Sequence, residues 1–364
     1  MTGSMDQGAS ANPGSPAPER SRSEHAGPEP AGIPPKLSVV ITCWNYSQYV
    51  DRAIRSVQSQ HREDCELLVV DDGSTDGSWE VIGSTGARAL RVDNGGQRKA
   101  CLHGLHHTLS PFVLFLDADD ELLPGSLEAI IANLDDSVAK LQFPLKRMDG
   151  DGNIISGPVP ELDAFRGRQL VRRVLQTGVY TTPPTSGNVF RRDVCHLLEG
   201  AEYDKAVDGV ILFAAPFMGD VVSLSQPLGL YRVHDRNDSG LGTELNSQSL
   251  RRDLRRFVDR MGHLRQIVET YGFAGELVVP EQAYFYLERR FYLAVAEGER
   301  ISVQSLLRLL TVLWREYYPA RTKAVITAFF LMTSMLPKER ARRGLAYRLD
   351  AGKRSPLGLL QALI

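Results

Sequence analysis

A short apolar run, residues 112–116, ends in three carboxylates within four positions, Asp117, Asp119 and Asp120. The run has the length and composition of a buried strand. A buried strand that ends in clustered acids brings negative charge to one point at the edge of a sheet. Mg²⁺ and Mn²⁺ prefer oxygen ligands and usually bind through one or two carboxylates together with phosphates. The run by itself predicts either a divalent-metal site or a solvated turn that caps a helix.

The order strand, polar loop, helix repeats through the first third of the chain. Strand-length apolar runs, separated by helical stretches, cover residues 37–42, 66–70, 87–92 and 112–116. This alternation predicts an α/β fold with a parallel sheet covered by helices on both faces. Ligands of such sheets bind beyond the carboxyl ends of the strands. We therefore expect the polar residues that follow these four strands to meet at one edge.

The rest of the chain divides less clearly. We predict a strand over 138–148, a loop leading into a short strand over 181–192, a helix over 206–218 and a strand over 227–233. Apolar positions recur with a helical period from about residue 245 to 349. Residues 1–35 hold seven Pro and five Gly and too few large apolar side chains to offset the entropy of ordering. The predicted parts are a disordered tail (1–35), an α/β domain (36–239) and a helical C-terminal region (240–364).

Composition excludes several classes of protein. A net charge of −2 and the lack of zinc-finger or basic-region patterns argue against nucleic acid as a partner. The four cysteines are far apart, with no Cys-x-x-Cys pair, which favours reduced thiols in a cytoplasmic protein. No apolar core of a secretory signal is visible near residue 1. The apolar run 324–336 has thirteen residues, too few to span a bilayer.

Two loops at the expected edge are suited to a nucleotide. Asp72, after the second strand, can accept a charge-assisted hydrogen bond from the imide N–H of a base. The alternative is a turn in which Ser74 caps the next helix. The loop of Asn94, Gly95 and Gly96 allows a close approach of backbone to a ligand, although a plain turn explains it nearly as well.

Group transfer to a hydroxyl also needs a base that takes the hydroxyl proton. Asp208 is our candidate because it stands at the start of the predicted apolar helix, with Asp204 and Glu202 as nearby rivals. The alternative for Asp208 is an acid that stabilises the helix dipole at its N-terminus.

Four segments in this order resemble the family 2 glycosyltransferases of the GT-A fold: LSVVITCWNY at 37–46, VVDDGSTD at 69–76, NGG at 94–96 and DADD at 117–120. Each segment alone is a weak signal, whereas the combination is specific, and the resemblance covers roughly residues 36–239. It implies inverting transfer of a sugar from a nucleotide-diphospho-sugar donor, with Mg²⁺ or Mn²⁺, to a glycan or lipid-linked acceptor. It also implies a place in cell-surface glycan synthesis, such as polysaccharide, O-antigen, capsule or glycolipid.

The resemblance also implies roles for individual residues. On the donor side, the matching positions are Thr42 and Trp44 around the nucleoside, Asp72 at the base, Asn94 and Gly95 in the glycine loop, and Arg232 near the diphosphate. The metal ligands implied are Asp117, Asp119 (the more direct of the two) and His234. The sugar and acceptor side is shaped by Ser186, Gly187 and Asn188, Asp208 is the base, and Ser239 lies in a closing segment.

The chain departs from the family pattern at Val207, where Glu often precedes the catalytic Asp. This keeps open a non-catalytic nucleotide-sugar-binding protein on the same fold. A sugar nucleotidyltransferase is a further alternative, although no glycine-rich phosphate loop with Arg or Lys follows the first strand. Residues 248–252 resemble the Gln-x-x-Arg-Trp signature of processive synthases without its Trp, so we predict transfer of a single sugar.

Two charged features stand apart from these motifs. Residues 321–354 hold nine Lys or Arg against two acids, a net charge of 9 − 2 = +7, beside the apolar run. Such a segment predicts peripheral binding to the anionic inner face of the cell membrane, or else a solvated helical face. His103 and His107 have the spacing of metal ligands on a helix, with His106 between them. No acid lies beside them in the sequence, so we expect a solvated helix face.

Overall fold

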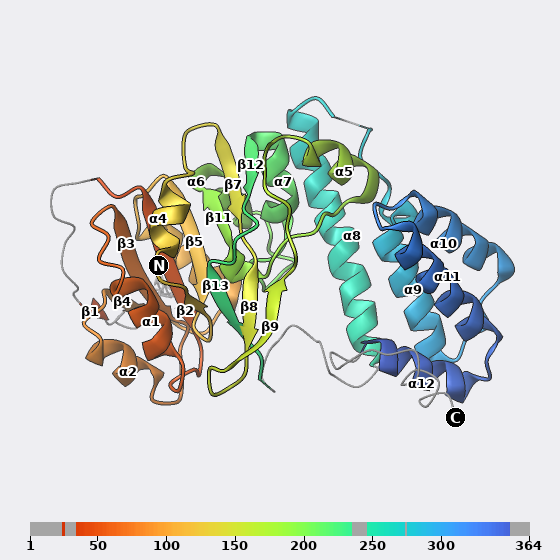
Figure 1. Ribbon diagram of the computed structural model, residues 1–364, viewed down its shortest axis with the longest axis horizontal. Coiled ribbons are helices and arrows are strands. Elements are labelled where there is room, and N and C mark those ends of the chain that lie inside the picture. The colour runs from red at the N-terminus through yellow and green to blue at the C-terminus, as the bar shows by residue number, and fades with distance from the viewer. Residues whose placement is uncertain (1–23, 26–33, 235–245, 274, 350–364) are drawn as a thin grey trace, which may run out of the picture.

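The computed structural model describes residues 24–25, 34–234, 246–273 and 275–349 (Figure 1). Helices cover both faces of a central sheet, and a separate group of helices follows at the C-terminal end. The predicted α/β fold class with a helical C-terminal extension is thereby confirmed. Most of the predicted tail 1–35 lies outside the described residues, as do Ser239, the proposed boundary at 239–240 and the end of the basic segment, 350–364.

The central sheet orders its nine described strands as β1-β4-β3-β2-β5-β11-β7-β12-β10. β4, β3, β2 and β5 are parallel to one another, and β7 is parallel to β12, whereas β11 runs antiparallel between β5 and β7. The strands span β1 Glu24–His25, β2 Leu37–Cys43, β3 Cys65–Asp71, β4 Ala89–Arg91, β5 Phe112–Asp117, β7 Val138–Gln142, β10 Phe165–Gly167, β11 Asn188–Arg191 and β12 Asp220–Ser223.

Each face of this sheet has its own apolar core. Side chains alternate along a strand, so Val40 packs on one face while Val39 and Ile41 pack on the other. Against the face of Val40 lie α3 Gln97–His106, α5 Leu170–Thr177, α6 Arg192–Cys195, α7 Val210–Met218 and α8 Ser247–Thr270. The opposite face is covered by α1 Val50–Gln58, α2 Ser78–Ser84 and α4 Ser126–Ile131.

The strand predicted over 138–148 is two strands, β7 and β8 (Leu145–Met148), because the chain leaves the central sheet after Gln142. Pro144 lacks the N–H that would continue the ladder. The following residues form β8, in a second sheet ordered β6-β13-β8-β9. Its other strands are β6 Glu121–Leu122, β9 Ile154–Val159 and β13 Gly229–Arg232. The helix predicted from residue 206 begins at Val210, so Asp208 lies in the loop before α7.

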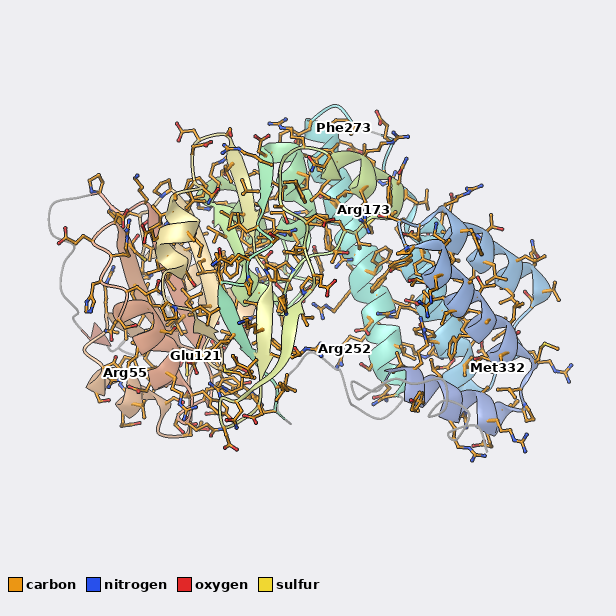
Figure 2. The ribbon with its side chains drawn as sticks, viewed as in Figure 1. Arg55, Glu121, Arg173, Arg252, Phe273 and Met332 are labelled. Carbon is orange, nitrogen blue, oxygen red and sulfur yellow. The ribbon has the colours of Figure 1, made fainter. Side chains whose placement is uncertain are left out.

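The C-terminal helices have a third core. It is built from α9 Tyr284–Glu297, α10 Val303–Arg315, α11 Ala320–Met335 and α12 Lys338–Leu349. α8 joins this core to the sheet, since Leu250 and Leu254 pack with the helices while Phe257 and Met261 pack with the sheet. Met332 on α11 therefore lies at the opposite end of the molecule from Arg55 on α1 (Figure 2). None of the described helices is long and apolar enough to cross a membrane.

Candidate active site

The acids after β5 lie at the carboxyl edge of the parallel strands, as the strand pattern predicted. Thr42, near the end of β2, stands directly opposite Asp117 at the end of β5. On its other side, β2 pairs with β3, so Cys43 stands opposite Asp71 and next to the loop that begins at Asp72. Four consecutive strand ends therefore converge on one edge.

Asp72 forms hydrogen bonds with the glycine loop, residues 94–96. Its two carboxylate oxygens accept hydrogen bonds from the backbone N–H groups of Gly95 and Gly96, each at 2.8 Å. The Asn94 side chain donates in turn to the backbone oxygen of Asp72 at 3.0 Å. Burial raises the pKa of Asp72, and the two backbone hydrogen bonds oppose that rise. The structure thus brings Asp72, Asn94 and Gly95 together, and it adds an internal role in which Asp72 shapes the loop.

Gln97 connects Asp117 to the segment that holds the proposed base, Asp208. This first residue of α3 donates from Nε2 to Oδ1 of Asp117 at 2.6 Å. Its Oε1 accepts from the backbone N–H of Val207 at 3.2 Å. Val207 immediately precedes Asp208. One amide side chain therefore fixes the position of Asp117 relative to the residue before Asp208.

The segment predicted to shape the acceptor side contacts the same acids from η1, just before β11. The Ser186 hydroxyl, in η1 Thr185–Gly187, accepts from the backbone N–H of Asp117 at 3.1 Å and donates to Asp120 at 2.6 Å. Asn188 is fully buried and donates to the carbonyl oxygens of Pro183 and Pro184 at 3.1 and 2.8 Å. Ser186 therefore contacts these acids directly, while Asn188 holds the loop that carries Ser186.

Asp119 faces the chain that leaves β13. Nε2 of His234 lies 2.9 Å from Oδ2 of Asp119, and the His234 ring stacks on Tyr49 at a centroid distance of 5.3 Å. Arg232 is fully buried: its Nε donates to the backbone oxygen of Asp119 at 3.0 Å and its Nη2 donates to Glu121. His234 thus lies beside the metal motif as expected. The contacts of Arg232 suit a residue that positions Asp119.

The carboxylates of Asp117, Asp119 and Asp120, together called the acid cluster, repel one another. Burial, followed by the charges of Asp119 and Asp208, raises the pKa of Asp117 well above its usual range. Burial, followed by the charges of Asp119 and Asp117, raises the pKa of Asp120 well above its usual range. A divalent cation would offset this repulsion, and carboxylates with one imidazole are a suitable donor set for Mn²⁺ or Mg²⁺. The residues present therefore fit the metal that the family resemblance implies.

Asp208 lies beside the same cluster. Burial raises its pKa, whereas a hydrogen bond from Thr185 and the charge of Lys140 lower it. The rivals have other surroundings: Asp204 forms an ion pair with Arg256 at 2.8 Å, and Glu202 is exposed. Among the three acids, Asp208 is the one whose charge interacts with Asp117.

The comparisons with known proteins agree with this site. The sequence model described as "Glycosyl transferase family 2" matches residues 38–196, which contain the strand ends and the acids. Residues 38–196 are therefore similar to glycosyl transferase family 2. Over 217 residues it is 34% identical to an uncharacterized glycosyltransferase of Nostoc, a match that covers 56% of this chain and 66% of that protein.

A further relative and a solved structure differ in coverage. The GalNAc(5)-diNAcBac-PP-undecaprenol beta-1,3-glucosyltransferase of Campylobacter jejuni is 30% identical over 131 residues, covering 33% of this chain and 41% of that protein. The crystal structure of S. aureus TarS 1–349 in complex with UDP-GlcNAc has a TM-score of 0.47 and 16% identity, covering 86% of each chain. The chain spans less than two thirds of the length of the Nostoc and Campylobacter relatives.

The sequence analysis missed three residues of the site. Gln97 lies next to the glycine loop and Thr185 lies in the loop predicted within residues 181–192, and neither is among the predicted site residues. Lys140 was placed in a strand without comment, although a Lys between apolar neighbours was a signal that could have been used. Trp44, which was predicted to line the nucleoside pocket, is 54% exposed beside Cys43, a position that leaves its ring free to stack on a ligand.

Proposed function

We propose that this chain is an inverting glycosyltransferase of family 2 that moves a single sugar from a nucleotide-diphospho-sugar to an acceptor hydroxyl. The observation that carries the proposal is the meeting of Asp117, Asp119 and Asp208 at the carboxyl edge of four parallel strands. The first two acids belong to the segment that the family model matches, and Asp208 reaches them from beyond it.

Asp117, Asp119 and His234 would hold a Mg²⁺ or Mn²⁺ ion. Bound there, the ion would supply Lewis-acid stabilisation of the charge that develops on the leaving nucleoside diphosphate. Hydrogen bonds already orient these ligands: Gln97 holds Asp117, and Arg232 holds the backbone at Asp119. The protein thus holds two carboxylates in fixed positions, and donor phosphates would complete the coordination.

Asp208 would act as the base. Its carboxylate takes the proton of the acceptor hydroxyl while the hydroxyl oxygen bonds to the anomeric carbon. The bond between that carbon and the diphosphate oxygen breaks on the opposite face, so the configuration inverts. A base must be ionised to work, and Thr185 and Lys140 favour the ionised form of Asp208 against the effect of burial.

The donor nucleoside would lie over the ends of β2 and β3. Trp44 offers an exposed ring for stacking, and Thr42 lies on the same edge opposite Asp117. The hydrogen-bonded loop that contains Asp72, Asn94 and Gly95 would lie beside the nucleoside. Ser186, Gly187 and Asn188 would shape the sugar and acceptor side, since Ser186 reaches both Asp117 and Asp120.

The acceptor class is proposed as a glycan or a lipid-linked glycan of the cell envelope. The name of the Campylobacter relative describes a glucosyltransferase that acts on an undecaprenol-linked glycan. A lipid-linked acceptor fits peripheral contact with the inner face of the cell membrane. Exposed apolar side chains of α10 and α11 and the basic residues after residue 320 would provide that contact.

Calorimetry with UDP, GDP and dTDP tests the donor site. We expect one nucleoside diphosphate to bind in the presence of Mn²⁺ and to bind much more weakly with EDTA. The proposal fails if all three bind equally well with EDTA, or if none binds with Mn²⁺.

Hydrolysis and transfer from the matching nucleotide-sugar test the base. We expect Asp208→Asn to retain nucleotide binding and to lose roughly 10²–10⁴-fold in turnover. Glu202→Gln, an exposed acid six residues earlier, is the matched control and should keep wild-type turnover. Unchanged turnover in Asp208→Asn would refute its role. The anomeric configuration of the product, read by NMR, tests inversion.

A further inference from the structure

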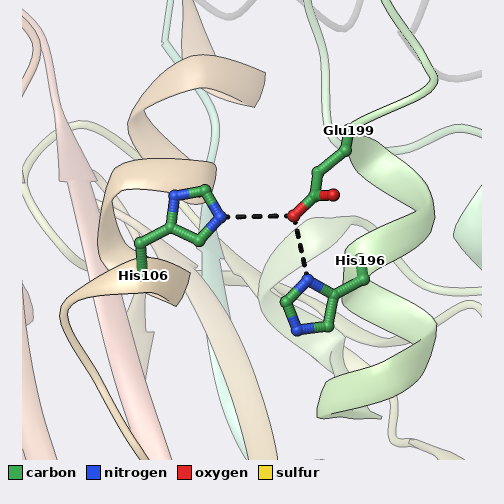
Figure 3. Close-up of side chains that lie close together, drawn as sticks. All are labelled: His106, His196 and Glu199. Carbon is green, nitrogen blue, oxygen red and sulfur yellow. Dashed lines mark hydrogen bonds and ion pairs between the residues drawn. The ribbon is translucent and has the colours of Figure 1, made fainter.

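Two histidines and a glutamate form a cluster on the surface, away from the acids at the sheet edge. His106 ends α3, His196 begins η2 His196–Leu198, and Glu199 follows η2. Oε1 of Glu199 lies 2.9 Å from Nδ1 of His196 and 3.2 Å from Nε2 of His106 (Figure 3). The ligand atoms of all three side chains lie within 4.8 Å of one another, and all three residues are exposed.

These distances resemble the edges of a metal coordination shell. A tetrahedral Zn²⁺ ion with bonds of about 2.0 Å separates its ligand atoms by roughly 3.3 Å. The two nitrogen–oxygen distances in the cluster are within a few tenths of an ångström of that edge. We propose that His106, His196 and Glu199 form a binding site for a single Zn²⁺ ion or a similar transition-metal ion.

The backbone under the cluster is firmly held, so only side-chain rotations are needed to bind an ion. Arg98, which is nearly buried, donates to the carbonyl oxygen of Leu198 at 2.8 Å, next to Glu199. Arg192 donates to the carbonyl oxygen of Leu105 at 2.6 Å, next to His106. Leu105 and Leu198 are themselves 1% exposed. Both ligand-bearing segments are therefore anchored in the core directly beside the ligands.

The donor set selects the class of metal. Imidazole nitrogens suit Zn²⁺, Co²⁺, Ni²⁺ and Cu²⁺, whereas Mg²⁺ prefers oxygen ligands. Glu199 adds one carboxylate oxygen, which lies between the two imidazole rings. Two imidazoles and one carboxylate leave a fourth position of a tetrahedral ion open to water. The site thus differs from the acid cluster, where the proposed donors are mainly carboxylates.

Spacing in the sequence pointed to other residues. His103 and His107 have helical metal-ligand spacing, but Nδ1 of His107 lies 2.8 Å from the backbone oxygen of His103. The carboxylate that the sequence lacked nearby comes from Glu199, 93 residues beyond His106. An ion at this site would join the end of α3 to the segment that leads to Asp208.

Metal titration of the full chain tests the site without any activity measurement. We would titrate Zn²⁺ against a chromophoric chelator with Mg²⁺ in excess, so that Mg²⁺ competes for sites made of oxygen ligands. We expect one Zn²⁺ per chain, a rise in Tm on binding, and visible Co²⁺ absorption typical of a nitrogen- and oxygen-ligated tetrahedral ion. His106→Asn and His196→Asn should each weaken binding at least tenfold.

A matched control is available at another exposed histidine. His61 has a positive φ of +48°, a conformation that Asn tolerates well, so His61→Asn should fold and bind Zn²⁺ as the wild type does. Equal affinity in the wild type, His106→Asn and His196→Asn would overturn the proposal. So would loss of the Co²⁺ spectrum in Asp119→Asn with its retention in His106→Asn, because the ion would then occupy the acid cluster.

Discussion

Lys140 is a buried lysine whose three hydrogen-bond partners are all neutral side chains. It is 0% exposed in β7 and donates to Gln142, Tyr180 and Thr182 at 3.0, 3.0 and 2.8 Å. Burial lowers the pKa of Lys140 well below its usual range, and the charge of Asp208 raises it. The ammonium and the Asp208 carboxylate therefore favour each other's charged forms through space, even though burial disfavours both.

We predict that Lys140→Met moves the acidic limb of the pH–rate profile to higher pH. Removing the cation raises the pKa of Asp208 further, so a smaller fraction of the base is ionised at a given pH. Below the limb, kcat/KM for transfer should be lower than in the wild type, because less of the base is ionised. At high pH, where Asp208 is ionised in both proteins, the two rates should converge. The measurement is kcat/KM against pH.

Tyr180→Phe is the control for this prediction. It removes one hydrogen bond to the Lys140 ammonium and keeps the charge, so its acidic limb should stay at the wild-type pH. A Lys140→Met limb that also stays in place would mean that Lys140 does not affect the charge of Asp208. A uniform loss of rate at every pH would indicate a structural role instead.

At the scale of elements, η1 packs tightly against the loop that precedes it. A Cβ atom added at Gly187 would lie 2.6 Å from Cβ of Pro183 and 2.7 Å from the carbonyl oxygen of Phe143. Neither the proline ring nor the backbone can move aside easily. The neighbouring residues Thr185 and Ser186 contact Asp208 and the acid cluster, so the packing at Gly187 sets the position of groups at the site.

We predict that Gly187→Ala lowers the free energy of unfolding by about 1–3 kcal/mol, the usual cost of overpacking. Turnover should also fall, because η1 must shift relative to Asp208. Urea unfolding and turnover of the folded protein measure the two effects. Gly157→Ala is the control, since a Cβ atom at Gly157 would meet no atom within 4 Å. Wild-type stability in Gly187→Ala would contradict the packing argument.

The residues at the edge of the sheet could be predicted from the sequence. The contacts that join distant segments of the chain at this edge could not. The alternation of apolar strands with helices predicts the parallel sheet and places Asp72 and Asp117 at the same edge. The contacts of Gln97 with Val207 and of Thr185 with Asp208 join segments far apart in the chain. No local periodicity reports such contacts. The strand predicted over 138–148 is divided in two because Pro144 ends the ladder inside an apolar run.

At the scale of the whole molecule, helix α11 of the C-terminal region exposes apolar side chains. Val325, Leu331 and Met335 on α11 are exposed. Its other side packs into the helical core through Phe329 and Phe330. Described basic residues lie in its first turn, at Arg321 and Lys323, and after its end, at Lys338, Arg340, Arg342 and Arg343. Exposed apolar side chains between cations match the interface of an anionic bilayer.

We therefore predict that the chain co-sediments with vesicles containing phosphatidylglycerol, less so at high salt, and not with neutral vesicles. The double variant Leu331→Glu, Met335→Glu should bind several-fold more weakly, because it removes apolar contact and adds repulsion. Its matched control is Ile154→Glu, Leu109→Glu on the sheet domain, where exposure is similar: 57% and 87%, against 42% and 85%. Equal loss in both double variants would show a general effect of charge. Unchanged vesicle binding in the α11 variant would show that α11 does not contact lipid. A wild-type dimer that dissociates in this variant would show that α11 contacts a second copy of the chain instead.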